Sequence, residues 1–282
     1  MNKTMHLISN AHLDPIWQWE WEEGCASAVA TFRCAARFCR EFDNYIFCHN
    51  EALIYRWVEE YDPALFREIR ELVRLGKWHI MGGWHVQPDC NMPSGEAFVR
   101  QITEGRRYFR EKFGVEPTTA INFDPFGHTR GLVQILAGTG YDSYIFCRPH
   151  EGLCHLPAET FRWVGYDGSS VIAQRAQTGY STALGNAMKK IRPTTEALTD
   201  AAPLGFCLWG VGNHGGGPSR EDIRAINAFM EEAKAEGVTV LHSTPEAYFA
   251  DVRAEAAAGT RVLPEHHGDL TAWAQGCYTS QV

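Results

Sequence analysis

Short apolar runs rich in β-forming residues alternate along this chain with stretches of helical periodicity, and this alternation constrains the fold more than any other feature. We expect strands at residues 5–9, 45–48, 78–81, 120–123, 143–147, 161–164, 171–174, 205–210 and 238–241. We expect helices at residues 26–42, 51–60, 63–75, 95–113, 131–138, 220–236 and 245–257.

Repeated β-then-α units predict parallel strands joined by right-handed crossovers. With about seven or eight such units, the predicted fold class is α/β, a parallel (β/α)7-type barrel of the glycoside hydrolase or deacetylase kind. An open doubly wound sheet is the alternative, although no glycine-rich dinucleotide fingerprint follows a strand. In a parallel barrel the active site lies at the carboxyl ends of the strands, so the residues that follow each strand carry the functional information.

Composition excludes several classes of partner. The formal net charge is −8 without a basic block, which argues against nucleic acid. No apolar run approaches the roughly 20 residues that span a bilayer, and the apolar part of the N-terminus is too short for a signal peptide. The nine cysteines are scattered without a Cys-x-x-Cys pair, which predicts free thiols in a reducing cytoplasm and no cysteine zinc site.

Two polar motifs follow predicted strands. His12 and Asp14 come after the first strand, and in extended chain residues i and i+2 point the same way, so the two side chains share a face. An imidazole and a carboxylate on one face suit a divalent metal, whereas a His–Asp hydrogen bond that caps the strand end is the alternative. Asp124 follows the fourth strand and precedes a proline, and a helix cap is its alternative role. Taken together, the three side chains favour a metal site.

Five ordered segments, from residue 10 to residue 280, resemble the signatures of family 38 α-mannosidases. They are His-x-Asp-Pro-x-Trp at 12–17, Gly-Gly-Trp-x-x-x-Pro-Asp-x-Asn-x-Pro-Ser-Gly-Glu at 82–96, Asp-Pro-Phe-Gly-His at 124–128, Gly-x-Gly-Asn-His-Gly-Gly-Gly-Pro at 210–218 and Gly-Cys-Tyr-Thr-Ser at 276–280. The resemblance implies a catalytic barrel at residues 1–260 and the start of a following helical region at 261–282. It also implies a substrate that is a mannose-containing oligosaccharide.

The resemblance implies one Zn²⁺ held by His12, Asp14 and Asp124, with Asp124 also acting as the nucleophile of a retaining glycosidase. Such an enzyme needs a nucleophile and an acid/base group, and the metal serves as a template and Lewis acid for sugar hydroxyls. Four further residues are expected to bind substrate, the aromatic ones by covering the apolar face of the sugar. They are Trp17, Phe126, Arg148 and Tyr180; core packing is the alternative for Trp17 and Phe126, and a surface ion pair for Arg148.

The sequence departs from the family pattern at two places. An Asp acid/base is replaced by the Asn213-His214 segment, so His214 is the candidate acid/base, with a substrate contact as its alternative role. The His expected shortly before Gly276 is missing, and only His266 and His267 lie nearby as a fourth ligand. Three protein ligands still make a sound open zinc site. His128 is expected to be a structural hydrogen-bonding residue.

Two other functions stay open: a zinc-dependent carbohydrate deacetylase on a similar barrel, and a truncated remnant that binds mannose without turnover. A homo-oligomer is also among the alternatives, and linkage preference is not encoded in these motifs.

Overall fold

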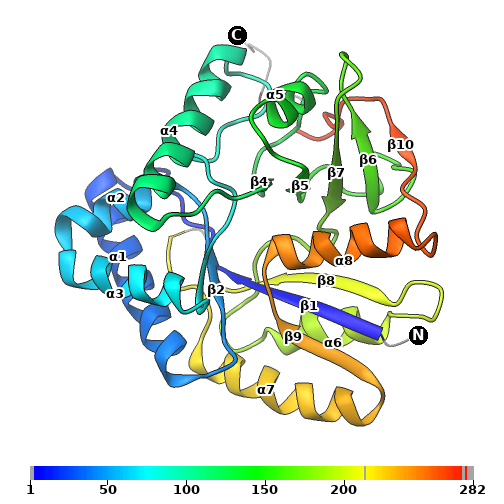
Figure 1. The fold of residues 1–282 in the computed structure, drawn as a ribbon. Coiled ribbons are helices and arrows are strands. Elements are labelled where there is room, and N and C mark those ends of the chain that lie inside the picture. Colours follow the sequence, from blue (N-terminus) through cyan, green and yellow to red (C-terminus); the bar gives the residue numbers. More distant parts are fainter. Residues whose placement is uncertain (1–2, 213, 275–276, 278–282) are drawn as a thin grey trace. The chain divides into compact units, whose positions relative to one another are not determined.

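The chain divides into two compact units made of interleaved segments. The computed structural model describes residues 3–212, 214–274 and 277. Unit 1 takes its described residues from Met1–His49, Leu53–Ile80 and Tyr180–Asp251, and unit 2 from Asn50–Ala52, Met81–Gly179 and Val252–Val282. Each unit contains one five-stranded sheet (Figure 1).

The sheet of unit 1 is parallel and centred on the first strand. Its strands are β1 (Lys3–Asn10), β2 (Phe47–His49), β3 (Trp78–Ile80), β8 (Leu204–Trp209) and β9 (Val238–His242). β1 pairs with β8 on one side, and on the other with β9 in its first half and β2 at its end. β1 is buried from Met5 to Asn10, as expected for a central parallel strand covered on both faces.

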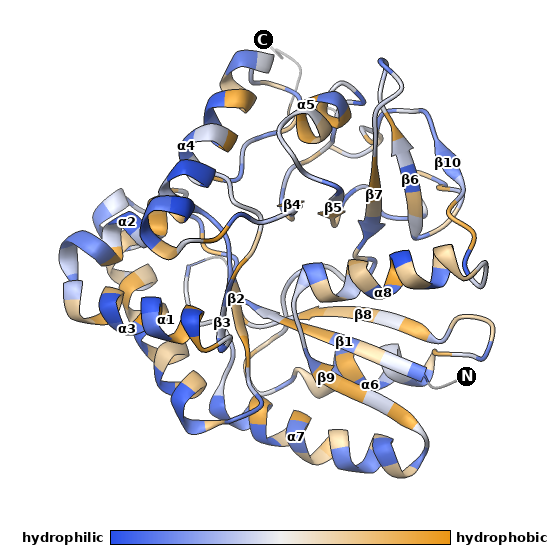
Figure 2. Cartoon of the chain, in the orientation of Figure 1, coloured by the Kyte–Doolittle hydropathy of each residue, from blue (hydrophilic) through white to orange (hydrophobic). Residues whose placement is uncertain are grey.

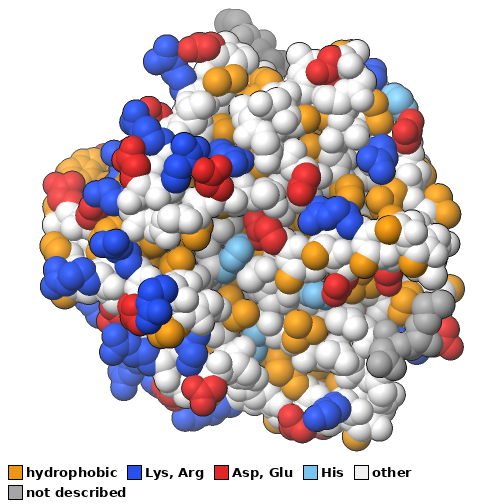
Figure 3. Space-filling view, viewed as in Figure 1, with side chains coloured by type: hydrophobic (Ala, Val, Ile, Leu, Met, Phe, Trp, Pro, Cys, Tyr) orange, Lys and Arg blue, Asp and Glu red, His pale blue; other side chains and the backbone are white. Residues whose placement is uncertain are grey.

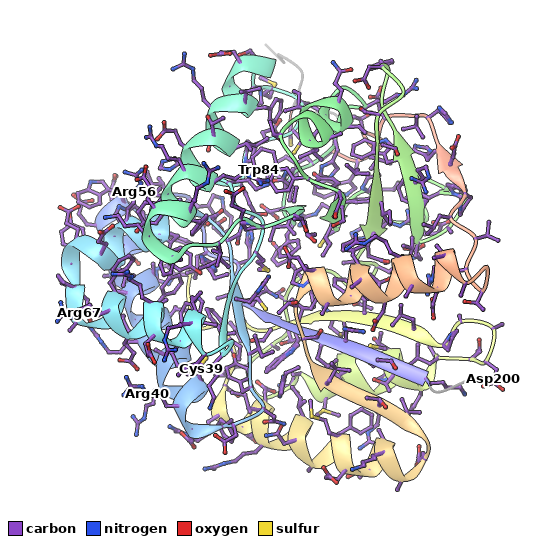
Figure 4. All side chains as sticks on the ribbon, viewed as in Figure 1. Cys39, Arg40, Arg56, Arg67, Trp84 and Asp200 are labelled. Atoms are coloured by element: carbon purple, nitrogen blue, oxygen red, sulfur yellow. The ribbon has the colours of Figure 1, made fainter. Side chains whose placement is uncertain are left out.

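Apart from α8, the helices of unit 1 are amphipathic and turn their polar faces outward. They are α1 (Trp21–Glu41), α2 (Ala52–Tyr61), α3 (Pro63–Arg74), α6 (Met188–Glu196), α7 (Arg220–Ala235) and α8 (Pro245–Ala257), of which α2 and α8 each extend into unit 2. In Figure 2 polar and apolar bands alternate along α7. Figure 3 shows basic side chains with acidic neighbours over the region of α2 and α3, and Arg40, Arg56 and Arg67 point outward in Figure 4.

The sheet of unit 2 is mixed, in the order β10-β6-β7-β5-β4. Its strands are β4 (Thr119–Asn122), β5 (Ser143–Phe146), β6 (Thr160–Val164), β7 (Ser170–Arg175) and β10 (Glu265–His266). Only β6 and β7 are antiparallel, and they form a hairpin whose turn contains Asp167 and Gly168, with Gly168 at φ +84°. The helices α4 (Gly95–Phe113) and α5 (Leu132–Gly138) pack on an apolar core that includes Trp84, labelled beside α4 in Figure 4.

The predicted α/β class with parallel strands is confirmed, and the expected helices and strands end within about two residues of their predicted ends, except that α1 begins at Trp21 and not at residue 26. Closure of the strands into one barrel stays a prediction, as does a domain boundary at residue 260. The sequence analysis missed β10 and α6. The start of α6 depends on Asp222 of α7, whose carboxylate accepts hydrogen bonds from the amides of Gly185 and Ala187 at 3.0 and 2.9 Å.

No helix within the described parts of the chain combines the length and the apolar character that crossing a membrane requires.

Candidate active site

The end of β1 in unit 1 is fixed by backbone contacts. The Asn10 side-chain amide donates to the carbonyls of Trp209 and Tyr180, at 3.2 and 3.1 Å. Gly210 has φ +126°, and a side chain there would collide with the Asn10 carbonyl. These contacts hold the chain rigidly where it leaves the sheet, just before the predicted ligands.

His12 and Asp14 lie together in unit 1, as their spacing predicts. His12 Nε2 and Asp14 Oδ1 are 3.4 Å apart, with 4% and 24% of the two side chains exposed. Tetrahedral Zn²⁺ with bonds of about 2.0–2.1 Å places neighbouring ligand atoms roughly 3.3 Å apart. The donor chemistry and the spacing of this pair therefore fit two ligands of one zinc ion. The predicted substrate residue Tyr180 packs against the His12 ring, with centroids 4.5 Å apart.

A second group in unit 1 surrounds the candidate acid/base. His214 Nε2 lies 2.6 Å from Glu23 Oε1, and the His214 ring packs edge-on against Trp19 at 4.3 Å. Trp19 donates its indole N–H to the Asp14 carbonyl at 3.1 Å, and Trp17 packs against Trp19 with 60% of its surface exposed. An exposed Trp17 is not a core residue, so its core-packing alternative is wrong.

Glu23 is a site residue that the sequence analysis missed. It stands in the first turn of α1, where acidic residues are common for reasons of helix stability alone. Since a carboxylate only accepts, His214 Nε2 carries the proton in this hydrogen bond, and Glu23 fixes the ring orientation. Asn213, its neighbour in the sequence motif, lies outside the described residues, as do four of the five residues of the motif at 276–280.

Asp124 and Arg148 meet in unit 2 because of strand register. Asn122 of β4 pairs with Phe146 of β5 in a parallel ladder, so the residues two places beyond each strand lie side by side. Arg148 Nη1 donates to Asp124 Oδ1 at 2.5 Å and to the Asp124 carbonyl at 2.6 Å. The guanidinium thus fixes one carboxylate oxygen and the backbone of the candidate nucleophile. A substrate contact for Arg148 stays a prediction.

Aromatic rings flank this pair. The Arg148 guanidinium carbon lies 5.9 Å from the Phe126 ring centroid and 4.8 Å from that of Trp273, and the two rings are 5.2 Å apart. These distances are those of cation–π contacts. The sequence analysis missed Trp273.

His128 is a buried structural residue, as expected. Its Nε2 lies 3.0 Å from the Arg148 carbonyl and its Nδ1 2.7 Å from the Tyr144 hydroxyl. A carbonyl only accepts, so Nε2 carries a proton. Because a pKa lowered by burial keeps the ring neutral, Nδ1 accepts from the Tyr144 hydroxyl. Burial lowers the pKa of His128 to about 4.

His266 and His267 have separate surroundings in unit 2. His266 lies on β10 and packs edge-on against Phe161, whereas His267 is exposed and its Nε2 lies 3.0 Å from Glu265 Oε2. A ligand role for either histidine stays a prediction.

Comparisons with known proteins agree on one family. The model of the glycosyl hydrolases family 38 N-terminal domain matches residues 2–276. Alpha-mannosidase G of Dictyostelium discoideum is 27% identical over 97% of this chain, which covers 25% of that protein. The alpha-mannosidase of Saccharomyces cerevisiae is 26% identical over 97% of this chain, which covers 26% of it. The chain thus spans about a quarter of the length of these relatives.

Solved structures give the same fold. An alpha-mannosidase from Enterococcus faecalis matches 96% of this chain and 31% of its own with a TM-score of 0.79 at 19% identity. A putative polysaccharide deacetylase from Mycobacterium smegmatis matches 91% of this chain and 92% of its own with a TM-score of 0.60 at 13% identity. At these identities the likeness concerns the fold alone.

Proposed function

Because this chain belongs to glycosyl hydrolase family 38, as an N-terminal domain, we propose that it is the catalytic part of a retaining, zinc-dependent α-mannosidase. The observation that carries the proposal is the family match over residues 2–276, and it is supported by residues of metal-ligand type that follow β1 and β4. The substrate class we propose is the terminal α-mannoside of an oligosaccharide or glycan.

The proposed metal ligands are His12, Asp14 and Asp124. One imidazole and two carboxylates form a donor set that zinc accepts, and it leaves a coordination position for substrate oxygens. The 3.4 Å spacing of His12 Nε2 and Asp14 Oδ1 supports this assignment. When bound, zinc supplies a Lewis acid and a template for sugar hydroxyls.

Asp124 is the proposed nucleophile. Its carboxylate attacks the anomeric carbon, the bond to the leaving oxygen breaks, and a glycosyl ester forms on the protein. Arg148 fixes Oδ1 and the Asp124 backbone, so the carboxylate enters the reaction in one orientation. A carboxylate that is already oriented loses little entropy in reaching the transition state, which lowers the activation free energy.

His214 is the proposed acid/base. In the first step it protonates the departing oxygen, and in the second it removes a proton from the water that cleaves the glycosyl ester. Glu23 supports this role as the partner of Nε2, which leaves Nδ1 for the proton transfer. We propose that Trp17 and Phe126 provide aromatic surfaces for the sugar, and that Tyr180, beside His12, contacts substrate.

The nine cysteines are all free thiols, and seven of them are buried or partly buried. Free thiols are typical of proteins in a reducing compartment. We therefore propose the cytoplasm as the location.

The proposal is tested by zinc content and turnover of an aryl α-mannoside, with and without a chelator. We expect close to one zinc per chain and turnover that is lost on chelation and restored by zinc. Asp14→Asn is expected to lower both zinc content and turnover, whereas Asp167→Asn in the exposed β6–β7 turn serves as the matched control. A zinc-free chain with chelator-resistant turnover would contradict the metal assignment.

The deacetylase alternative is separated by its product. A deacetylase releases acetate from an acetylated sugar and leaves an α-mannoside intact. The proposed enzyme cleaves the α-mannoside and releases no acetate. A remnant that only binds would show mannose binding without either product.

A further inference from the structure

We propose that Glu51 and Gln87 are positioning residues that hold the backbone of the nucleophile, an inference that rests on the proposed role of Asp124. All residues concerned lie in unit 2. Neither Glu51 nor Gln87 belongs to the metal, nucleophile or acid/base assignments above.

Glu51 is a buried acidic residue in an unusual backbone conformation. It is 2% exposed and has φ +44°, one of two non-glycine residues with positive φ among the described ones. Left-handed backbone is strained for a glutamate, and such strain persists where surrounding contacts determine the conformation, often at functional sites. One such contact follows at once: the Ala52 amide donates to the Trp84 carbonyl at 3.0 Å.

Gln87 links Glu51 to the strand that carries Asp124. Its backbone amide and its side-chain amide both donate to Glu51 Oε1, at 3.1 and 3.3 Å. Its side-chain oxygen accepts from the Phe123 amide at 2.8 Å. A carboxylate only accepts and a backbone amide only donates, so the Gln87 amide has one possible orientation between them.

The loop around Gln87 is held rigidly by α4. The Gln101 carbonyl accepts from the His85 amide at 2.9 Å, and the Gln101 side-chain oxygen accepts from the Val86 amide at 3.0 Å. Gly105 lets α4 approach so closely that a Cβ there would lie 2.6 Å from the His85 nitrogen. The loop that carries Gln87 is therefore held by α4, through contacts that do not involve β4.

The consequence is that the Asp124 backbone is held from two sides. β4 ends at Asn122, so the Phe123 amide lies beyond the strand and takes Gln87 as its partner. On the other side, Arg148 binds the Asp124 carbonyl. Gln87 holds the peptide that precedes Phe123 and Arg148 holds the peptide that follows Asp124, so the segment from Phe123 to Asp124 is fixed at both ends, and Glu51 fixes Gln87.

A side-chain swap tests this arrangement. Gln87→Met keeps length but removes both hydrogen bonds of the side chain, and Gln87→Glu keeps the acceptor for Phe123 but sets two carboxylates against each other. The double variant Glu51→Gln with Gln87→Glu restores one amide and one carboxylate in exchanged places. Gln134→Met, on the exposed face of α5, is the matched control.

We expect Gln87→Met and Gln87→Glu to lower kcat on an aryl α-mannoside roughly 10- to 100-fold, with a smaller change in KM. The double variant should recover most of that kcat, and Gln134→Met should match the wild type. Hydrogen exchange of the Phe123 amide gives a readout independent of turnover. It should be fast in Gln87→Met and slow again in the double variant.

Three results would contradict different parts of this proposal. If folded Gln87→Met keeps the kcat of an active wild type, the positioning role is wrong and the proposed function stands. If the double variant is no better than Gln87→Glu, the specific pairing with Glu51 is wrong. If the wild type itself lacks α-mannosidase turnover, the proposed function fails and the positioning role fails with it.

Discussion

Acid should destabilise this protein through His128, and the size of the effect follows from its environment. The ring is fully buried, donates to the Arg148 carbonyl and accepts from the Tyr144 hydroxyl, so it is neutral in the folded state. Burial lowers its pKa from 6.5 to about 4. The unfolded chain binds this proton more readily than the folded one.

The sign and the magnitude follow from linkage. A histidine with a depressed folded pKa contributes stability that is complete above its unfolded pKa of 6.5 and is lost as the pH falls toward about 4. At about 1.4 kcal/mol per pH unit, the gap between 6.5 and about 4 corresponds to roughly 3 kcal/mol. The pKa values of His49 and His242 are also lowered by burial, to about 3 each. Protonation of several histidines therefore contributes to the slope of the wild type's free energy of unfolding against pH.

The assay is chemical denaturation at a series of pH values through this window. His128→Gln keeps a donor and an acceptor but does not titrate, so the free energy of unfolding should fall less steeply, by about 1.4 kcal/mol per pH unit. Tyr144→Phe is the matched control. It removes the hydrogen bond to Nδ1 and should lower stability by about 1 kcal/mol with the slope unchanged. An equal slope in His128→Gln and wild type would refute the reasoning.

Three further predictions concern unit 2. Gly105→Ala should lower the free energy of unfolding by roughly 1–3 kcal/mol, because its methyl group meets loop backbone, whereas Gly138→Ala, with open space around it, should be neutral or slightly stabilising; denaturation midpoints decide this. Arg175→Met should cost roughly 1–3 kcal/mol by the same measurement, because the carbonyls of Pro149 and Cys154 lose their buried donor while the partly exposed Glu151 and Glu159 are left to water, and an unchanged stability would contradict this. Arg148→Lys should lower kcat roughly 100-fold, since a lysine ammonium cannot reproduce a planar guanidinium that lies against Phe126 and Trp273 while donating to Oδ1 and the carbonyl oxygen of Asp124, and near-normal steady-state turnover would contradict its role.

The sequence predicts those parts of the site that depend on chain-local geometry. His12 and Asp14 share a face because they are two residues apart in extended chain, and the structure places them 3.4 Å apart. Asp124 and Arg148 follow strands that the alternation of strand and helix predicts, and parallel register brings them together.

Long-range contacts account for what the sequence could not predict. The start of α6 is fixed by Asp222 from another helix, and its internal Pro193 reads locally as a helix breaker. Glu51 and Gln87 lie 36 residues apart, and only the path of the loop over α4 brings them into contact. Trp273 contacts Arg148 and Phe126, which lie far earlier in the chain, so its place in the site depends on tertiary structure.

Covalent trapping on Asp124 tests the central claim most directly. A fluorinated mannoside that forms the glycosyl ester faster than water cleaves it should leave one sugar on the protein, and peptide mapping by mass spectrometry should place it on Asp124. An adduct on another residue, or steady turnover without any adduct, would contradict the account.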